Sequence, residues 1–438
     1  MRNIHQYRVE NSDIFKEQLL LWASQFHRVA YLDSHNVDQM VNSKKEYNSY
    51  ELLVGVDVLS EILPSDDHFE ILQKQIEVHP DWWFGFLSYD LKNQVEKLES
   101  QNHDGVQMPE LHFFRPRWVF ILQERTLEIH TPKDVFSTEE VNTLFDEICQ
   151  IPIRPAKEPI VDFVKARISR EEYLTAVQEL KYHIQRGDIY EVNFCQEFYS
   201  EKITVDAVDT YRKLKAVSPT PYSCFYRLDE KYLLSASPER YLKKKGSKLV
   251  SQPIKGTARR GVTPEEDEQI KQHLFSDPKE RAENIMIVDL VRNDLSRTAY
   301  KGSVHVEELC GIYSFPQVHQ MISTVVSFLR EDKHFVEAIK CSYPMGSMTG
   351  APKVRAMKLI EKFESTKRGL YSGAVGYITP EGDFDFNVVI RSLQYNAVRE
   401  YLSFMVGGAI TMRSIPENEY EECLLKAKAI MKVLNCNF

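Results

Sequence analysis

Three closely spaced prolines set the main constraint on how this chain can be organised. Pro152, Pro155 and Pro159 all fall in the segment 151–159. A proline cannot continue a helix, and it pushes the residue before it towards extended conformations. The segment is therefore predicted to be an extended connector. It separates an N-terminal region, residues 1–150, from a longer C-terminal region, residues 160–438.

Hydrophobic periodicity predicts helices and strands on both sides of this connector. Ser169-Arg170-Glu171-Glu172 has the form of a capping box and begins a helix that runs to Ile184. Further helices are predicted at 12–27, 277–286, 354–360 and 416–433. Strands are predicted at 82–89, 118–122, 190–199, 223–227, 232–235, 372–378 and 401–407.

Composition excludes several classes of partner. The formal charge of −9 gives no general attraction to nucleic acid or to an anionic membrane surface. No apolar run reaches the ~18 residues of a membrane span, and the polar N-terminus does not look like a signal peptide. Seven cysteines without paired short spacings favour a reducing compartment. We expect a soluble cytoplasmic protein that does not bind nucleic acid or membrane.

Lys255 carries the strongest chemical signal, in the run Pro253-Ile254-Lys255-Gly256-Thr257. Residues 248–252 before it alternate as a half-buried strand, and Gly256 and the segment 259–261 indicate a loop, so the lysine is placed at a strand end. At the ordinary lysine pKa of about 10.4, few molecules are neutral at pH 7, so a nucleophilic lysine needs desolvation or nearby cations. A solvated lysine at a strand end is the alternative interpretation.

Two predicted helices carry glutamates at helical spacing. Glu280 and Glu283 share one face, and Glu419 and Glu422 share another with Lys426. If the two faces meet, four carboxylates could bind Mg²⁺, which would accept a substrate carboxylate as a further ligand held by Lys426. A solvated face is the alternative interpretation of each pair.

Glycine-rich loops supply candidate anion contacts. Residues 344–353 contain Ser347 and Thr349 and lead into a helix, whose first N–H groups favour an anion, although the run lacks the phosphate-loop register. Two side chains add further groups: Tyr371 has a phenol, and Arg391 has a guanidinium suited to a carboxylate. The Gly407-Gly408 pair would let the backbone come close to a ligand. Each of these, taken separately, is also an ordinary strand end.

Two more residues complete the set of candidates. Glu239, in Ala236-Ser237-Pro238-Glu239-Arg240, is a candidate general acid or base. His319 is a candidate hydrogen-bonding imidazole, although a lone histidine is more often structural.

Taken in this order, these segments resemble the chorismate-utilising enzymes. The family includes component I of anthranilate synthase and of aminodeoxychorismate synthase, together with isochorismate and salicylate synthases. The resemblance is strongest over residues 165–435. The motifs that carry it are Gly187–Tyr190, Ser237–Glu239, Pro253–Thr257, Glu283–Asp294, His319, Gly350–Lys353, Gly373–Gly376, Ile390-Arg391 and Glu419–Lys426.

The family resemblance implies an α+β chorismate-binding fold. Two stacked, largely antiparallel β-sheets flanked by helices would hold chorismate and Mg²⁺ in a cleft between them. Residues 160–438 would form the catalytic region, and residues 1–150 would add strands and helices to the same sandwich, so that the connector need not be a domain boundary. Tyr31-Leu32-Asp33-Ser34 resembles the family segment that lines a tryptophan pocket, which implies a regulatory or structural pocket there.

Within the family, lysine at position 255 is similar to the aminodeoxychorismate synthases, whereas other members generally carry alanine. The resemblance implies that Lys255 attacks C2 of chorismate as the 4-hydroxyl leaves. Ammonia then adds at C4 and expels the lysine, giving 4-amino-4-deoxychorismate for 4-aminobenzoate and folate synthesis. The enzyme would thus be a transferase of the transaminase type.

The resemblance also assigns roles to the other candidates. Glu239 would be the general acid/base, and the role of His319 stays open. The implied Mg²⁺ ligands are Glu280, Glu283, Glu419 and Glu422. The implied substrate contacts are Ser347, Thr349, Tyr371, Arg391, Gly407, Gly408 and Lys426.

Glu191 departs from the family pattern. Relatives that use water carry lysine there, and those that use ammonia commonly carry glutamine, so water is not the expected nucleophile. Glu191 is then a base or the ion-pair partner of a neighbour.

The ammonia is expected to come from a separate subunit. No segment is spare for a glutamine amidotransferase module of about 200 residues. Two alternatives stay open: an anthranilate synthase component I, which eliminates pyruvate, and a non-catalytic effector-binding subunit.

Overall fold

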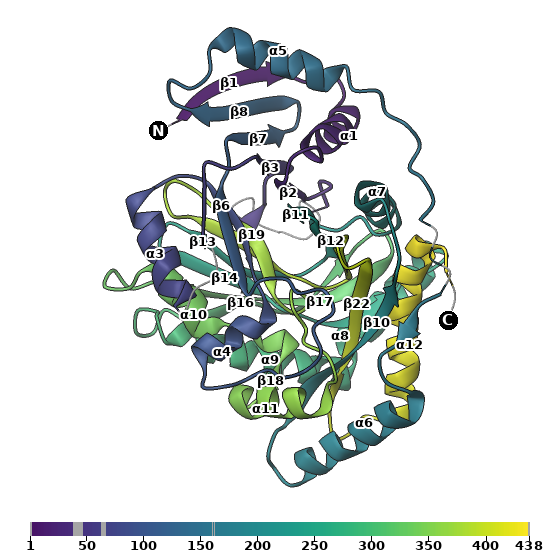
Figure 1. Ribbon diagram of the computed structural model, residues 1–438. Coiled ribbons are helices and arrows are strands. Elements are labelled where there is room, and N and C mark those ends of the chain that lie inside the picture. The colour runs from purple at the N-terminus through teal and green to yellow at the C-terminus, as the bar shows by residue number, and fades with distance from the viewer. Residues whose placement is uncertain (1, 38–46, 63–66, 160, 162, 437–438) are drawn as a thin grey trace.

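The computed structural model describes residues 2–37, 47–62, 67–159, 161 and 163–436 (Figure 1). Its strands form two antiparallel sheets, as predicted. The larger sheet has the order β1-β8-β7-β3-β2-β11-β12-β21-β22-β10-β18, with β9 beside β10. The smaller has the order β15-β17-β14-β13-β20-β19-β5-β6-β4, with β16 beside β17.

The strands of the larger sheet are β1 (Arg2–Arg8), β2 (Arg28–Asp33), β3 (Leu52–Val56), β7 (Trp118–Gln123), β8 (Thr126–Pro132), β9 (Lys165–Ala166), β10 (Glu191–Glu201), β11 (Tyr222–Leu228), β12 (Lys231–Ser237), β18 (Gly350–Ala351), β21 (Ser392–Asn396) and β22 (Tyr401–Ile410). Those of the smaller sheet are β4 (Ser60–Ile62), β5 (Trp83–Leu87), β6 (Leu111–Arg115), β13 (Arg240–Lys245), β14 (Lys248–Gln252), β15 (Ile254–Arg259), β16 (His305–Ser314), β17 (Val318–Phe328), β19 (Ala374–Ile378) and β20 (Phe384–Val388).

The helices are α1 (Ser12–Ala23), α3 (His68–Val78), α4 (Lys92–Val95), α5 (Thr138–Cys149), α6 (Arg170–Gln185), α7 (Ala207–Val217), α8 (Pro264–Ser276), α9 (Pro278–Ser296), α10 (Phe335–Ser342), α11 (Lys353–Phe363) and α12 (Pro416–Leu434), with short 3₁₀ turns at η2 (Tyr89–Leu91) and η3 (Gly346–Met348). In Figure 1, α1 and α5 lie with β1 and β8 at one end of the molecule, and α6 and α11 lie at the other. No helix within the described ranges is both long and apolar enough to cross a membrane.

The N-terminal region contributes strands to both sheets. In the larger sheet β2 pairs with β11, and in the smaller sheet β5 pairs with β19. The connector 151–159, which has no helix or strand, is held to α7 because Arg154 pairs with Asp209 and the Lys157 amide donates to the same carboxylate. Because β2 pairs with β11 and β5 with β19, strands from the two sides of the connector hydrogen-bond to each other.

The inner faces of the two sheets pack directly on each other. One buried apolar cluster combines Ala30 and Tyr226 of the larger sheet with Phe86 and Val375 of the smaller. At Gly55 of β3 an added Cβ would lie 2.7 Å from the ring of Phe84 in β5, so only glycine allows this close approach. The outer face of the larger sheet packs against α1, α5, α6, α7 and α12, and that of the smaller against α3, α9 and α10.

Most predicted elements are confirmed, and three predictions are wrong at their ends. The helix predicted at 277–286 continues as α9 to Ser296. α1 stops at Ala23 and not near residue 27, because the chain turns there to begin β2 at Arg28. The loop predicted after Lys255 is also absent: β15 continues to Arg259. The break in alternation at Gly256 marks a bulge within a strand, since the register with β17 shifts between Ile254 and Thr257.

A buried ion triad ties α1 to the larger sheet. Lys16 Nζ lies 3.2 Å from Asp33 Oδ1 and 3.2 Å from Glu51 Oε1, and all three side chains are buried. Burial opposes the charge on Lys16, but the two carboxylates outweigh it and raise the pKa of the lysine. The same cluster lowers the pKa of Asp33, where the attraction of His35 and Lys16 outweighs burial.

Lys16→Ala is expected to destabilise the protein by about 3–5 kcal/mol, because two buried carboxylates lose their shared cation. Urea unfolding followed by circular dichroism measures the change. Lys74→Ala, which breaks an exposed pair with Glu70, is the control and should leave the midpoint unchanged. Equal midpoints for the two variants would contradict a structural role for the triad.

Candidate active site

The candidate active site lies where β15 of the smaller sheet approaches β10 of the larger. Lys255, the second residue of β15, places its Nζ 3.0 Å from Oε1 of Glu191, the first residue of β10. The side chains are 11% and 1% exposed. An ion pair therefore joins the two sheets where water is nearly excluded.

The electrostatics of Lys255 differ from the expectation drawn from sequence. Burial alone lowers its pKa, but attraction to Glu191, and to Glu283 and Glu239 beyond it, outweighs burial and raises the pKa above the ordinary lysine value. Its surroundings in this structure therefore favour the charged lysine and do not supply the neutral amine that a nucleophilic role needs. A nucleophilic role requires the proton to leave, and the Glu191 carboxylate already accepts a hydrogen bond from Nζ.

Glu191 keeps one oxygen free. Its Oε1 accepts from Lys255, whereas its buried Oε2 has no hydrogen-bond partner among the described residues. A buried carboxylate oxygen without a partner costs free energy, so it marks a place where a donor from a ligand would be stabilised.

The backbone around Lys255 is held by two neighbours. Gly256 has a φ of 97°, and an added Cβ there would lie 3.1 Å from Glu280 Oε2. Asn284 of α9 donates its side-chain amide to the carbonyls of Lys255, at 3.4 Å, and Met321, at 3.3 Å. No role is predicted for Asn284 from the sequence. Its position directly after Glu283 is what would have drawn attention to it.

Glu239 is a buried carboxyl between β12 and β13. Burial raises its pKa to about 7, while hydrogen bonding to Ser347 and attraction to Lys255 act in the opposite direction. At neutral pH the group is therefore close to half protonated. Such a carboxyl can both give and accept a proton, as the predicted general acid/base requires.

The four predicted metal ligands face one another across α9 and α12. Lys279 lies close enough to all four to feel their charge. Burial lowers its pKa, but the attraction of the four glutamates is stronger, so the pKa is raised. Gly408 of β22 borders the same acidic region: an added Cβ would lie 3.4 Å from Glu419 Oε2 and 4.0 Å from Glu422 Oε1.

Burial opposes the charge on three of these four carboxylates. Burial raises the pKa of Glu280 and Glu419, and raises that of Glu283 to about 7. Only Glu422 has a lowered pKa, because its ion pair with Lys426 at 2.8 Å outweighs burial.

The donor set fits Mg²⁺ in chemistry, since carboxylate oxygens are the ligands it prefers. In the described part of the chain, however, no three acidic, histidine or cysteine side chains already converge as a metal cluster. Lys279 and Lys426 pair with Glu283 and Glu422 instead. The glutamates would therefore have to exchange these lysines for the ion.

The predicted substrate contacts flank this region. Arg391 is a largely buried guanidinium whose pKa is lowered by burial, and among the described residues no carboxylate pairs with it. Tyr371 is buried and accepts a weak hydrogen bond from Cys195 Sγ at 3.8 Å. Lys426 Nζ donates to the carbonyl of Gly407 at 2.8 Å. A guanidinium without a carboxylate partner among the described residues suits a carboxylate ligand.

Two predicted site residues form their hydrogen bonds with other parts of the protein. His319 is fully buried, with its Nδ1 2.9 Å from Ser314 Oγ and its Nε2 2.9 Å from Asp267 Oδ1, so both ring nitrogens have partners in the protein. The buried hydroxyl of Thr349 donates to the carbonyls of Met345 and Gly346 within its own loop. Their catalytic and substrate-binding roles stay predictions.

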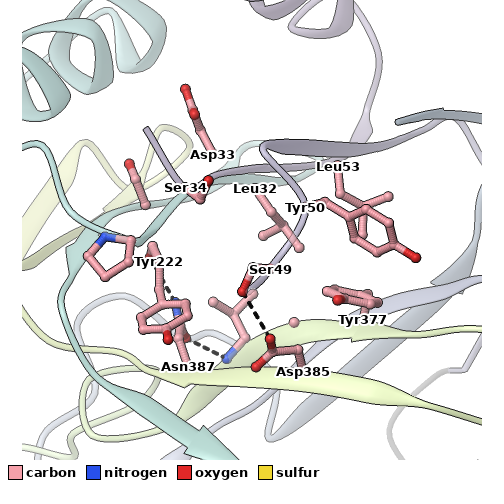
Figure 2. A pocket seen from close by; sticks show the side chains of 14 residues that line it. Leu32, Asp33, Ser34, Ser49, Tyr50, Leu53, Tyr222, Tyr377, Asp385 and Asn387 are labelled. Carbon is pink, nitrogen blue, oxygen red and sulfur yellow. Dashed lines mark hydrogen bonds between the residues drawn. The ribbon is translucent and has the colours of Figure 1, made fainter. Parts of the chain in front are cut away.

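A separate small cavity lies between the sheets near the predicted regulatory segment (Figure 2). Leu32, Asp33 and Ser34 line it from one sheet and Tyr377 and Asp385 from the other. Its volume of about 40 Å³ has room for a few water molecules. Tyr31, in contrast, lies in the outer core with its hydroxyl donating to the Lys16 carbonyl, so it does not line this cavity.

Glu239→Gln is expected to stabilise the protein at pH 8 and to have little effect at pH 5. The pKa of the folded carboxyl is about 7, above its ordinary 4.5, so stability falls as pH rises from about 4.5 to 7. This penalty amounts to about 3 kcal/mol above pH 7, and a neutral glutamine does not carry it.

Urea midpoints at both pH values measure the effect. Glu421→Gln, on the exposed face of α12, is the control with the same change of charge. If the Glu239→Gln midpoint equals that of the parent at pH 8, then ionisation of the buried carboxyl does not cost the protein stability and its pKa is not raised.

The relatives in sequence have two different functions by name. Anthranilate synthase component 1 of Aquifex aeolicus is 33% identical over 388 residues, covering 83% of this chain and 78% of the relative. Aminodeoxychorismate synthase component 1 of Bacillus subtilis is 33% identical over 360 residues, covering 80% of this chain and 76% of the relative.

A solved structure agrees with the fold along nearly the whole chain. Anthranilate synthase component I of Streptococcus pneumoniae superposes with a TM-score of 0.75 at 26% identity, covering 92% of each chain. The model of the chorismate binding enzymes matches residues 17–432. This protein therefore belongs to the chorismate binding enzyme family.

Proposed function

We propose that this protein is the synthase component of an aminodeoxychorismate synthase, which converts chorismate and ammonia to 4-amino-4-deoxychorismate. The observation that supports it is Lys255, held between the sheets 3.0 Å from Glu191 and beside Glu239. Family membership alone does not separate this function from anthranilate synthesis, since relatives of both kinds are equally similar.

The first displacement uses three side chains. Lys255 loses a proton to Glu191 and its amine forms a bond to C2 of chorismate. Both ring double bonds shift by one position, the C4–O bond breaks, and protonated Glu239 gives its proton to the departing hydroxyl, which leaves as water. The pKa of about 7 for Glu239 suits this transfer near neutral pH.

The second displacement reverses the first. Ammonia forms a bond to C4, both ring double bonds shift back, and the C2–N bond to Lys255 breaks, which returns the lysine as a free amine. The new C4 ammonium gives a proton to Glu239, and Glu191 returns its proton to Lys255. The net exchange is ammonia for water. Two displacements on one face of a bound ring replace one difficult step.

Binding of the substrate would use the groups predicted for it from the sequence. Arg391 and Tyr371, with the Gly407-Gly408 backbone, would hold the enolpyruvyl carboxylate. Mg²⁺, held by Glu280, Glu283, Glu419 and Glu422, would supply charge for the ring carboxylate, near Ser347 and Lys426. We place the protein in the cytoplasm, where its seven unpaired cysteines would stay reduced.

Lys255→Ala is expected to reduce formation of aminodeoxychorismate from chorismate, Mg²⁺ and ammonium on the order of 10³-fold or more, because the nucleophile is lost. Products are identified by mass and by conversion to 4-aminobenzoate with added lyase. Lys358→Ala, on the exposed face of α11, is the control. The parent should use ammonium but not glutamine, which would require a separate amidotransferase subunit.

The favoured alternative is anthranilate synthesis, because an anthranilate synthase component 1 is as similar to this chain as an aminodeoxychorismate synthase component 1. Anthranilate with release of pyruvate by the parent, or an unchanged rate in Lys255→Ala, would overturn the proposed function while leaving the family intact.

Glu283→Gln is expected to weaken Mg²⁺ binding about tenfold or more, since a charged oxygen ligand becomes a neutral amide. Calorimetric titration with MgCl₂ alone measures this without any turnover. Affinity should also fall below pH 7, where protons compete for a carboxyl with a pKa of about 7. Glu421→Gln is again the matched control, and equal weakening in both variants would refute the assigned ligand set.

A further inference from the structure

One buried arginine outside the predicted site uses every donor it has. Arg368, which is 1% exposed, follows α11 and forms an ion pair with Glu364, with Nε···Oε2 at 2.9 Å and Nη2···Oε1 at 2.6 Å. The other donors reach the Met348 carbonyl at 2.7 Å, the Asn193 carbonyl at 2.8 Å and Ser372 Oγ at 3.2 Å. A guanidinium has five N–H donors, and all are used here.

The three acceptors other than Glu364 belong to the segments that carry the site. Met348 directly follows Ser347, Asn193 lies two residues after Glu191, and Ser372 directly follows Tyr371. These segments are far apart in the sequence, and Arg368 joins them at one point.

Direct bonds between two of these segments strengthen the junction. The side-chain amide of Asn193 donates to the Ser347 carbonyl at 3.1 Å, and the Asn193 backbone amide donates to the Thr349 carbonyl at 2.8 Å. Ser347 in turn bonds the carboxyl of Glu239. A displacement at Arg368 would therefore reach both Glu191 and Glu239.

The arginine is itself held in place on both sides. Glu364 also accepts the backbone amide of Cys195 at 2.9 Å, which fixes the carboxylate to β10. The ring of Tyr89 lies under the guanidinium, 4.5 Å from Cζ to the ring centroid. Lysine could replace the charge but not the planar fork of donors.

We infer that Arg368 is a positioning residue for the reaction: through Met348, Asn193 and Ser372 it sets the relative positions of Ser347, Glu191 and Tyr371 without touching the substrate. This role rests on the proposed use of chorismate at this site. It is independent of which product the enzyme makes.

Arg368→Lys tests the role, with consumption of chorismate as the readout whatever the product. We expect kcat/KM to fall about 10²-fold, since misplacement of reacting groups by about 1 Å has that effect. The pH profile of kcat/KM should also move upward, because Ser347 would no longer hold down the pKa of Glu239.

Arg212→Lys is the matched control for loss of a buried guanidinium. Arg212 of α7, 9% exposed, pairs with Glu17 and Asp209 and donates to the Arg154 carbonyl, and none of these residues belongs to the predicted site. It should lose a similar amount of stability in urea, with kcat/KM within about twofold of the parent and an unchanged pH profile.

A double variant, Arg368→Met with Glu364→Leu, separates positioning from folding. Removing both charges together is often neutral for stability, whereas removing one is not. We expect a folded protein whose kcat/KM stays about 10²-fold low, since the carbonyls of Met348 and Asn193 lose their shared donor. Parent-like kcat/KM and pH profile in a folded Arg368→Lys or double variant would overturn the inference. Anthranilate as the parent's product would overturn the proposed function only.

Discussion

Contact between the inner faces of the two sheets is the constraint on which the rest of the structure depends. Gly55 against Phe84 sets how closely the sheets approach, and the aromatic cluster around Phe86 and Tyr226 fills the space beside them. Because strands from both sides of the proline connector enter each sheet, neither region has a complete core of its own. The site at Lys255 and Glu191 uses the same arrangement, since its two residues belong to different sheets.

Burial of charge is the main electrostatic feature of the site. Glu239 and Glu283 have pKa values of about 7, the Glu191 Oε2 has no partner in the described ranges, and Arg391 lacks a carboxylate there. Such groups are costly in a protein without ligand, and each is complementary to something the proposed reaction supplies: a proton, a cation, ammonia or a carboxylate. The stability lost there is offset by apolar packing elsewhere between and outside the sheets.

Rigid support for these groups comes from residues that touch no ligand. Asn284 holds the Lys255 backbone, and Arg368 connects the segments that bear Ser347, Glu191 and Tyr371. Neither stood out in the sequence, because a polar residue that bonds backbone carbonyls has no spacing of its own. The Glu364 and Arg368 pair, four residues apart at the end of a helix, looks there like an ordinary surface pair.

The sequence by itself determined many of the helices and strands and the chemical groups available to the site. Local periodicity and capping predict α6, α12 and eight of the strands (β5, β7, β10, β11, β12, β14, β19 and β22), and Lys255, Glu239 and the four glutamates were named from motif and helical spacing. Only the tertiary structure decided how these groups act on one another. The segment after Lys255, expected to be a loop, is a bulged strand. The carboxylates around Lys255 raise its pKa. Both ring nitrogens of His319 are hydrogen-bonded, one to Ser314 and one to Asp267. The physical reason is that pairing register, burial and ionic contacts depend on residues far apart in the chain, whereas periodicity and capping depend on neighbours.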